Sequence, residues 1–277
     1  MSQVLKILTH SGTFHADEVF ACALLKIIYK DIEVTRSRDK ELIDYAHNDS
    51  EIVVIDVGEK FEAPKNNFDH HQDMALPASA GLVWNEYKNK WITDQRITNK
   101  IYENLIRGID AIDKNTDNIL KEIEDLTYCI RTISQVIGGF NRDPNDHELQ
   151  QKQFFKAIEV AIEVLLNEKY KAEGQFRSEM IWKQGEFHKS FAIFSEYCSV
   201  WKERSRKYAD DFGNPLIRFA VMPNPQGWQI LSIDSKRYPL PEKINNKDLV
   251  FAHKARFIAI FKTKDSAVSF ARSICMS

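Results

Sequence analysis

The stretch EIVVIDVG, residues 51–58, decides how the N-terminal part of the chain is expected to fold. It is a continuous apolar run of strand length that ends at Asp56 and Gly58. The runs VLKIL (4–8) and IEVTRS (32–37) have the same character, and helical segments separate the three runs. Continuous apolar strands that alternate with helices are typical of a parallel sheet buried on both faces. The pattern therefore predicts an α/β fold with a parallel sheet flanked by helices.

The predicted secondary structure changes twice along the rest of the chain. Helical spacing dominates residues 79–137, and the cluster of Gly, Pro, Asn and Asp in GGFNRDPNDHE (138–148) favours a linker. A long amphipathic helix is expected over residues 149–174. Short alternating strands follow beyond about residue 175, and a helix over residues 263–275 closes the chain. They predict a second, smaller mixed α/β domain.

Length and composition bound the class of protein. The 277 residues fit two medium domains, and the segments divide them as an N-terminal domain over 1–140, a linker and long connecting helix over 141–185, and a C-terminal domain over 186–277. The composition, 43% hydrophobic and 28% charged, is that of a soluble globular protein. A net charge of -2 gives no global basic field of the kind that nucleic-acid binders show, although a local groove could still be basic.

Cysteine usage and the absence of apolar spans point to the cytoplasm. The cysteines are far apart and form no CxxC pair, so reduced thiols are expected, with a disulfide or metal role as the alternative; they are Cys22, Cys129, Cys198 and Cys275. The run FACALLKIIY is broken by Lys26 and is shorter than the roughly 18 residues of a membrane span. MSQVLKILTH lacks the apolar core of a signal peptide. We therefore expect a cytoplasmic protein without a membrane partner.

Imidazoles and carboxylates gather where the predicted strands end. The loop THSGTFHADE follows the first strand, DVGE ends the third, and NFDHHQ (67–72) comes shortly after. They supply His10, His15, Asp17, Asp56, Asp69, His70 and His71. In parallel α/β sheets ligands bind beyond the carboxyl ends of the strands. A pool of nitrogen and oxygen donors at that place predicts a site for a divalent metal that accepts both.

The spacing of these residues suits two metals. His15 and Asp17 are two residues apart, so on an extended segment their side chains point the same way. The Asp56 carboxylate has two oxygens and could bridge two metals, which an imidazole cannot do. His70 could complete the second metal and leave His71 free to meet an anionic substrate. Two metals in this arrangement would activate a water and clamp phosphoryl oxygens.

Each of these residues also has a simpler interpretation. A single histidine in a loop is usually solvated or caps a helix, and the acids of ADE suit a helix N-terminus without any metal. Asp110 and Asp113, in IRGIDAID, could equally be a solvated helix face. These interpretations do not explain why so many donors occur together at the predicted strand ends. The metal site is therefore the prediction, and the choice between Asp110 and Asp113 stays open.

The motifs THSGTFHADE, VVIDVG, NFDHHQ, SAGLVW and YENLIRGIDAIDKN, in this order, resemble the melanocyte-proliferating-gene (MYG) family of the DHH phosphoesterase superfamily. The resemblance extends through RYPLPE and FAHKARFIAIFKTKDSAVSFA and so covers nearly the whole chain. It implies a two-domain DHH fold, with a metal-binding catalytic domain followed by a substrate-binding domain. It also implies a manganese- or magnesium-dependent hydrolase of phosphodiesters. Eukaryotic members of the family look like 3′–5′ RNA exonucleases.

The resemblance also implies roles for single residues. The family's metal positions match His10, His15, Asp17, Asp56, His70 and one of Asp110 or Asp113. His71 matches the histidine expected to face the scissile phosphate, and Asp69 would hold an imidazole from behind. His15 stands where most DHH enzymes have an aspartate, which favours manganese, iron, cobalt or zinc over magnesium. We expect two divalent ions, with Mn²⁺ preferred.

The segment after His253 departs from the family pattern. Ala259 and Ile260 replace glycines that would let the backbone approach a phosphate or sugar closely. Lys254 and Arg256 either compensate by direct phosphate contact or form a solvated strand face. His253, Lys254 and Arg256, together with His71, are the expected substrate-binding residues.

The expected activity is hydrolysis of phosphodiester bonds with two divalent metals, in which Asp56, Asp69 and His71 are the catalytic residues. The expected substrate is a short single-stranded RNA or an oligonucleotide end. Two alternatives stay open: a small phosphorylated metabolite or dinucleotide as substrate, and a metal-binding module without turnover. A homodimer is compatible with the sequence.

Overall fold

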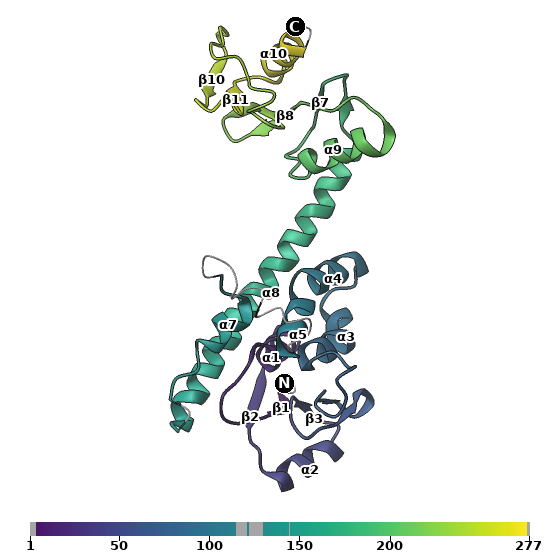
Figure 1. Cartoon of the computed structure of the whole chain (residues 1–277), viewed down its shortest axis with the longest axis vertical. Coiled ribbons are helices and arrows are strands. Elements are labelled where there is room, and N and C mark those ends of the chain that lie inside the picture. The colour runs from purple at the N-terminus through teal and green to yellow at the C-terminus, as the bar shows by residue number, and fades with distance from the viewer. Residues whose placement is uncertain (1–3, 115–120, 122–129, 144, 276–277) are drawn as a thin grey trace. The chain divides into compact units, whose positions relative to one another are not determined.

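The computed structural model describes residues 4–114, 121, 130–143 and 145–275. Its contacts divide the chain into two compact units, Met1–Ala172 and Glu173–Ser277 (Figure 1). This division falls inside one long helix, α8 (His147–Lys183), whereas the sequence pattern places a linker over residues 138–148. The reason is that Phe154, Ile158 and Leu165 of α8 are fully buried in the core of the first unit.

The first unit is built on a five-stranded sheet. Its strands are β1 (Leu5–Thr9), β2 (Ile32–Arg36), β3 (Ile52–Ile55), β4 (Phe61–Glu62) and β5 (Asn67–Phe68), in the order β2-β1-β3-β5-β4. The pairings β1–β2, β1–β3 and β3–β5 are parallel, and β4 runs antiparallel to β5 at the edge. The predicted parallel α/β sheet is thus confirmed. The strands β4 and β5, only two residues each, were not predicted.

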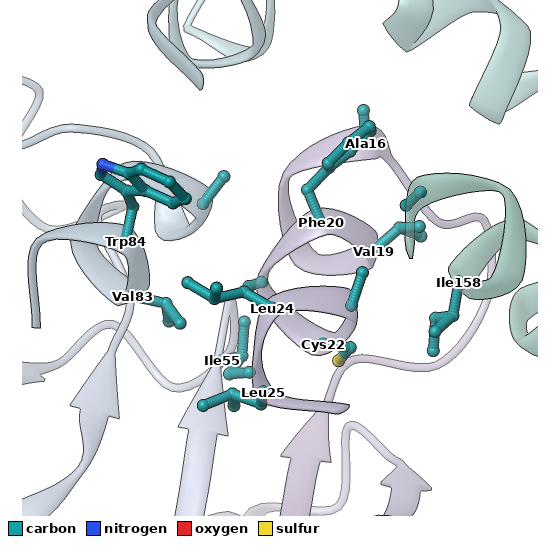
Figure 2. Close-up of a cluster of buried hydrophobic side chains, with 14 of the residues drawn as sticks. Ala16, Val19, Phe20, Cys22, Leu24, Leu25, Ile55, Val83, Trp84 and Ile158 are labelled. Atoms are coloured by element: carbon teal, nitrogen blue, oxygen red, sulfur yellow. The ribbon is translucent and has the colours of Figure 1, made fainter. Parts of the chain in front are cut away.

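Helices cover both faces of this sheet. They are α1 (Ala16–Tyr29), α2 (Lys40–Asn48), α3 (Ser79–Trp91), α4 (Gln95–Ile101), a π-helical turn (Tyr102–Ile106), α5 (Arg107–Asp113), α7 (Ile133–Gly138) and α8. On one face Ile7, Val53 and Ile55 pack in a large core with α1, α3, α5 and α8. Figure 2 shows Ile55 in this core, with side chains of α1, α3 and α8. On the other face Leu8 and Val54 pack against α2. Alternate residues of one strand therefore serve two cores, which explains the continuous apolar runs.

The second unit contains a six-stranded sheet. Its strands are β6 (Glu186–Phe187), β7 (Phe191–Ile193), β8 (Phe219–Asn224), β9 (Gly227–Ser232), β10 (Leu249–Ala252) and β11 (Ile258–Phe261), in the order β10-β11-β9-β8-β7-β6. Only the pairing β7–β8 is parallel among these strands. Helices α9 (Trp201–Phe212) and α10 (Lys264–Cys275) complete the unit. The predicted mixed α/β character is confirmed.

Several smaller predictions can be compared with the described residues. Residues 124–129 of the expected helix, and with them Cys129, lie outside the described residues. Cys22, Cys198 and Cys275 are free thiols, as expected. Among the described residues, no helix combines the length and the apolar character that crossing a membrane requires.

Candidate metal centre

Three strand ends converge at one edge of the first sheet. His10 follows β1, Asp56 follows β3, and Asp69 follows β5, each directly after the last strand residue. Because these strands are parallel neighbours, their carboxyl ends lie side by side, and the side chains that follow them meet. Helix α1 then begins at Ala16, and its first turn adds Asp17 and Glu18 to the same place. The predicted convergence of loops is therefore present in the fold.

His10 lies between two carboxylates. Its Nε2 is 3.1 Å from Glu18 Oε1 and 3.3 Å from Asp56 Oδ2, and the ring is only 2% exposed. Its Nδ1 donates to the carbonyl of Ser11 at 3.1 Å, which fixes the tautomer and leaves Nε2 facing the carboxylates. Burial alone would lower the pKa of His10, but Asp56 and Glu18 outweigh burial and raise the pKa to about 10. The surroundings of Nε2 therefore favour positive charge.

Asp56 occupies the centre of the site. Its backbone has a φ of 54°, a left-handed conformation that costs free energy for a residue other than glycine. Oδ1 accepts a hydrogen bond from Ser79 at 3.1 Å and lies 3.5 Å from His70 Nε2, while Oδ2 faces His10. Burial would raise the pKa of Asp56, but the two imidazoles hold it well below its usual range. Its oxygens thus face two separate histidines.

Two carboxylates of α1 are buried without full pairing. Asp17 and Glu18 are both 0% exposed. Both Asp17 oxygens and Glu18 Oε2 have no hydrogen-bond partner among the described residues. Burial, and then the charge of Asp56, raise the pKa of Asp17 well above its usual range. Buried carboxylates without partners are costly unless a cation meets them, so this arrangement calls for positive charge.

The segment Asp69–His71 forms the third wall. Asp69 is 1% exposed, and its Oδ1 accepts from both the backbone N at 3.1 Å and the ring Nδ1 at 2.7 Å of His71. Its Oδ2 accepts from the backbone N of Glu59 at 2.7 Å. His71 itself has a side chain that is 56% exposed, with Nδ1 3.6 Å from Asp56 Oδ1. Asp69 thus holds an accessible imidazole beside the cluster.

His70 turns the other way, toward α5. Its side chain is 5% exposed, and Nε2 lies 3.2 Å from Asp113 Oδ2, although neither ring nitrogen forms a hydrogen bond with the described residues. Asp113 and Asp56 raise the pKa of His70 to about 9, against the opposing effect of burial. A buried imidazole with no hydrogen bond and two carboxylates nearby is a typical metal-ligand environment.

The structure distinguishes the two aspartates of α5. Asp113 lies near His70, and one of its oxygens is within 4.8 Å of ligand atoms of His15 and Asp17. Asp110 instead accepts a hydrogen bond from the backbone N of Gly81 at 3.1 Å. Burial raises the pKa of Asp110 to about 7. Asp113 therefore lies among the other donors of the cluster, whereas Asp110 links α5 and α3.

The donor set fits divalent metals. Three groups of side chains each bring one donor atom per residue within 4.8 Å of one another: His10, His15, Glu18 and Asp56; Asp56, Asp69, His70 and His71; His15, Asp17 and Asp113. Asp56 belongs to two groups and His15 to two. Mixed imidazole and carboxylate donors suit manganese and other first-row divalent ions. The oxygens of Asp17, which have no hydrogen-bond partner in the described part of the chain, are a second sign of a cation site.

The cluster lies in a cavity of about 610 Å³. Part of its wall is apolar, formed by Val57, Met74, Ile109 and Ile112. A volume of this size is typical of sites for small organic ligands or cofactors. The cavity therefore combines a charged cluster with surface suited to a less polar part of a substrate.

Three predicted substrate-binding residues lie elsewhere, in the second unit. His253, Lys254 and Arg256 line a separate cavity of about 260 Å³. In the turn between β10 and β11, His253 Nδ1 accepts from the backbone N of Ala255 at 3.0 Å. Arg256 has a φ of 58°, and its Nε donates to the carbonyl of Leu240. The segments RYPLPE (237–242) and FAHKARFI (251–258) thus meet at this cavity.

Sequence reasoning missed one donor and two arginines. The sequence pattern marks Glu18 only as a helix N-terminal charge, but Glu18 contacts His10 and accepts from the backbone N of His15 at 2.9 Å. Arg36 donates to the carbonyls of His10 and Gly12. Arg38, in the same TRSRD segment, lines the cavity. The signal was available, because Arg36 is the last residue of a strand whose carboxyl end lies at the site and Arg38 comes two residues later.

An α/β unit with buried carboxylates and imidazoles at its strand ends is an arrangement that metal-dependent hydrolytic enzymes use. Residues 6–274 match the family MYG1_exonuc, described as "Uncharacterised protein family (UPF0160)". The chain belongs to this family, as the motifs predict.

Known relatives span nearly the same length. The chain is 30% identical to "MYG1 protein" of Dictyostelium discoideum, over 96% of this chain and 95% of the relative. It is 25% identical to "MYG1 exonuclease" of Homo sapiens, over 97% and 85% of the two chains. An exonuclease is a hydrolase, so this name agrees with the predicted enzyme class. A solved pGpG-specific phosphodiesterase, PggH from Vibrio cholerae, aligns over 99% of this chain and 98% of its own chain, with 15% identity and a TM-score of 0.33.

Proposed function

We propose that this protein is a two-metal hydrolase of phosphodiester bonds that acts as a 3′–5′ exonuclease on short single-stranded RNA. The observation that carries the proposal is the position of Asp17, a residue of the cavity lining that shares a donor group with His15 and Asp113 and whose two buried oxygens have no hydrogen-bond partner among the described residues. A metal-binding module without turnover needs no substrate cavity. This cluster adjoins a cavity large enough for a nucleotide-sized ligand, which favours an enzyme.

The metals would be held by His10, His15, Asp17, Asp56, His70 and Asp113, with Glu18 as an additional donor. Asp56 is the proposed shared ligand, because its two oxygens face His10 and His70. When bound, divalent ions at such a site supply Lewis-acid chemistry and lower the pKa of water. Mn²⁺ is the proposed ion, since the donors include at least three imidazoles beside the carboxylates.

His71 is the proposed contact to the scissile phosphate. Its exposed ring is held from behind by Asp69, so Nδ1 is occupied and Nε2 is left for a substrate oxygen. An Nε2–H in this position can donate a hydrogen bond to a phosphate oxygen. Asp69 acts through His71, and its own contact with Glu59 keeps the segment in place.

The substrate class is proposed from the cavity and from the family. The apolar wall offers contact surface to a base or sugar, whereas the cluster takes the phosphate. The name of the human relative, an exonuclease, favours a nucleic-acid end. His253, Lys254 and Arg256 are proposed to bind substrate, since two of them carry positive charge and all three line one cavity.

A second candidate substrate is a dinucleotide or another small phosphorylated metabolite, because a cavity of about 610 Å³ also suits a ligand of that size. Salt dependence distinguishes the two, because a polymer substrate releases several counterions on binding and a small one releases few. A steep decrease of affinity with salt supports the RNA substrate.

The test is hydrolysis of a 5′-labelled short RNA by metal-stripped protein with Mn²⁺ added back. Wild type is compared with Asp56→Ala and with Asp44→Ala, an exposed aspartate on α2 outside the cavity lining. We expect a ladder that shortens from the 3′ end in wild type and Asp44→Ala and no product in Asp56→Ala. No shortening in wild type, with Mn²⁺ shown to bind, would contradict the RNA substrate.

A further inference from the structure

Two arginines at the end of β2 have different environments. Arg36 is half-buried, donates to the carbonyl of His10 at 3.2 Å and to that of Gly12 at 2.6 Å, and its guanidinium lies 4.6 Å from the ring centroid of Phe154. Arg38 is exposed, and its Nε donates to the carbonyl of Ser11 at 3.2 Å. Arg36 therefore supports the loop from within, whereas Arg38 contacts the same loop from the solvent side.

Arg38 lines the same cavity as the metal-ligand cluster. No carboxylate among the described residues forms an ion pair with it, although several acids line that cavity. The other lysine or arginine of the lining is Lys114, whose Nζ already donates to the carbonyl of Leu76 at 2.6 Å. Arg38 therefore brings to the cavity a guanidinium whose terminal N–H groups are available to a ligand.

A guanidinium held at Nε keeps its two terminal nitrogens for another acceptor. Those nitrogens form a planar fork that matches the oxygens of a phosphate. The bond to Ser11 fixes the stem of Arg38 one residue from His10, so the fork is positioned relative to the cluster before any ligand arrives. Preorganisation of this kind reduces the entropy lost on binding.

We propose that Arg38 binds a second phosphate of the substrate, next to the phosphate that is cleaved. This inference rests on the proposed function and deepens it, because it makes an oligonucleotide with at least two consecutive phosphates the preferred ligand. The scissile phosphate belongs with the cluster and His71. The open fork of Arg38, at the exposed rim of the same cavity, then meets the neighbouring phosphate of the chain.

The test compares the dinucleoside monophosphate ApA, which has one phosphate, with the trinucleotide ApApA, which has a neighbouring phosphate whichever end is cut. Calorimetry gives the Kd of each, with Ca²⁺ in place of Mn²⁺ to limit turnover. We expect wild type to bind ApApA about 10- to 100-fold more tightly than ApA, as a charged phosphate contact implies. In Arg38→Ala this ratio should decrease to about 1–3, with ApA affinity little changed. Arg38→Lys should give an intermediate ratio, because it keeps the charge but loses the fork.

Controls separate phosphate binding from support of the His10 loop. Arg96→Ala removes an equal charge from α4, where Arg96 pairs with Asp94, and should keep the wild-type ratio. The Mn²⁺ affinity of Arg38→Ala should match that of wild type. If Arg38 only supported the His10 loop, its replacement would change the Mn²⁺ affinity and the affinities for ApA and ApApA together. Equal binding of ApA and ApApA by wild type, or a wild-type ratio in Arg38→Ala, would overturn the proposal.

Hydrolysis is measured separately with Mn²⁺. If wild type cleaves neither ligand but the binding ratio depends on Arg38, the proposed hydrolase activity fails and the phosphate site stands. If both are cleaved and the ratio is independent of Arg38, the activity stands and the Arg38 site fails.

Discussion

The ring Nδ1 of His71 donates to Asp69 Oδ1 at 2.7 Å, and the backbone N of His71 donates to the same oxygen at 3.1 Å. One buried oxygen therefore fixes both the ring and the backbone of a residue whose side chain is 56% exposed. The rotation of His71 is restricted while its Nε2 stays accessible.

Replacement of Asp69 should therefore reduce catalysis more than binding. In Asp69→Asn an amide substitutes for the carboxylate, and we expect kcat to decrease about 10- to 100-fold with a smaller change in KM. Steady-state kinetics with Mn²⁺ measure both. Asp73→Asn is the matched control, because Asp73 is exposed and accepts from the backbone N of Ala75 in the same loop. Equal effects of the two substitutions would contradict the role of Asp69.

The two aspartates of α5 should behave differently toward metal. Asp113→Asn removes a proposed ligand, so Mn²⁺ affinity should decrease by about 10-fold or more. Asp110→Asn leaves the donors of the cluster in place and should decrease Mn²⁺ affinity much less. Calorimetric titration of both metal-stripped variants measures the difference. A larger loss in Asp110→Asn would reverse the assignment of the ligand.

The contact between α3 and α5 depends on a glycine. A Cβ added at Gly81 would lie 2.3 Å from Asp110 Oδ2 and 2.7 Å from Pro77 Cβ. Gly81→Ala should therefore lower the free energy of unfolding by about 1–3 kcal/mol. Gly108→Ala is the control on exposed α5 surface, where a Cβ meets nothing within 4 Å, and it should raise stability by about 0.5–1 kcal/mol. Chemical denaturation distinguishes the two, and a stable Gly81→Ala would show that this packing can relax.

Asp110 should also give the metal-free protein a measurable pH dependence. Its pKa is about 7 in the fold, raised by burial above the ordinary value of 3.8. The folded state therefore binds more protons than the unfolded state between these values, and the contribution of Asp110 to stability is lost as pH rises through about 7. In EDTA, Tm should decrease from pH 5 to pH 8 less steeply in Asp110→Asn than in wild type. Parallel curves of Tm against pH for the two proteins would contradict a raised pKa of Asp110.

Much of the first unit's fold could be predicted from the sequence, because its long strands appear there as continuous apolar runs. The runs around residues 4–8 and 51–58 are buried on both faces, and the loops after them could be recognised as one site. The strand β5, which positions Asp69, has two residues, too few for a periodic pattern. Its place beside β3 is set by tertiary pairing.

Other features depend on contacts that a linear pattern does not contain. Glu18 has the ordinary position of a helix-terminal acid, and only the fold brings it to His10. Asp110 and Asp113 are one helical turn apart, and the contact of Gly81 with Asp110 distinguishes them. Residues 139–143 and 145–146 form an irregular connection between α7 and α8, as the local signal favours, but α8 packs in the core of the first unit, so this connection does not separate the two units.

The central claim is that the cluster is a two-metal site, and metal titration tests it most directly. Metal-stripped wild type, Asp17→Asn and Asp44→Asn are titrated with Mn²⁺ by calorimetry, with electron paramagnetic resonance to count bound ions. Wild type and Asp44→Asn should bind two Mn²⁺ per chain. Asp17→Asn should lose at least one, because it replaces the buried carboxylate without partners. Absence of Mn²⁺ binding in wild type, or an unchanged titration in Asp17→Asn, would contradict the account.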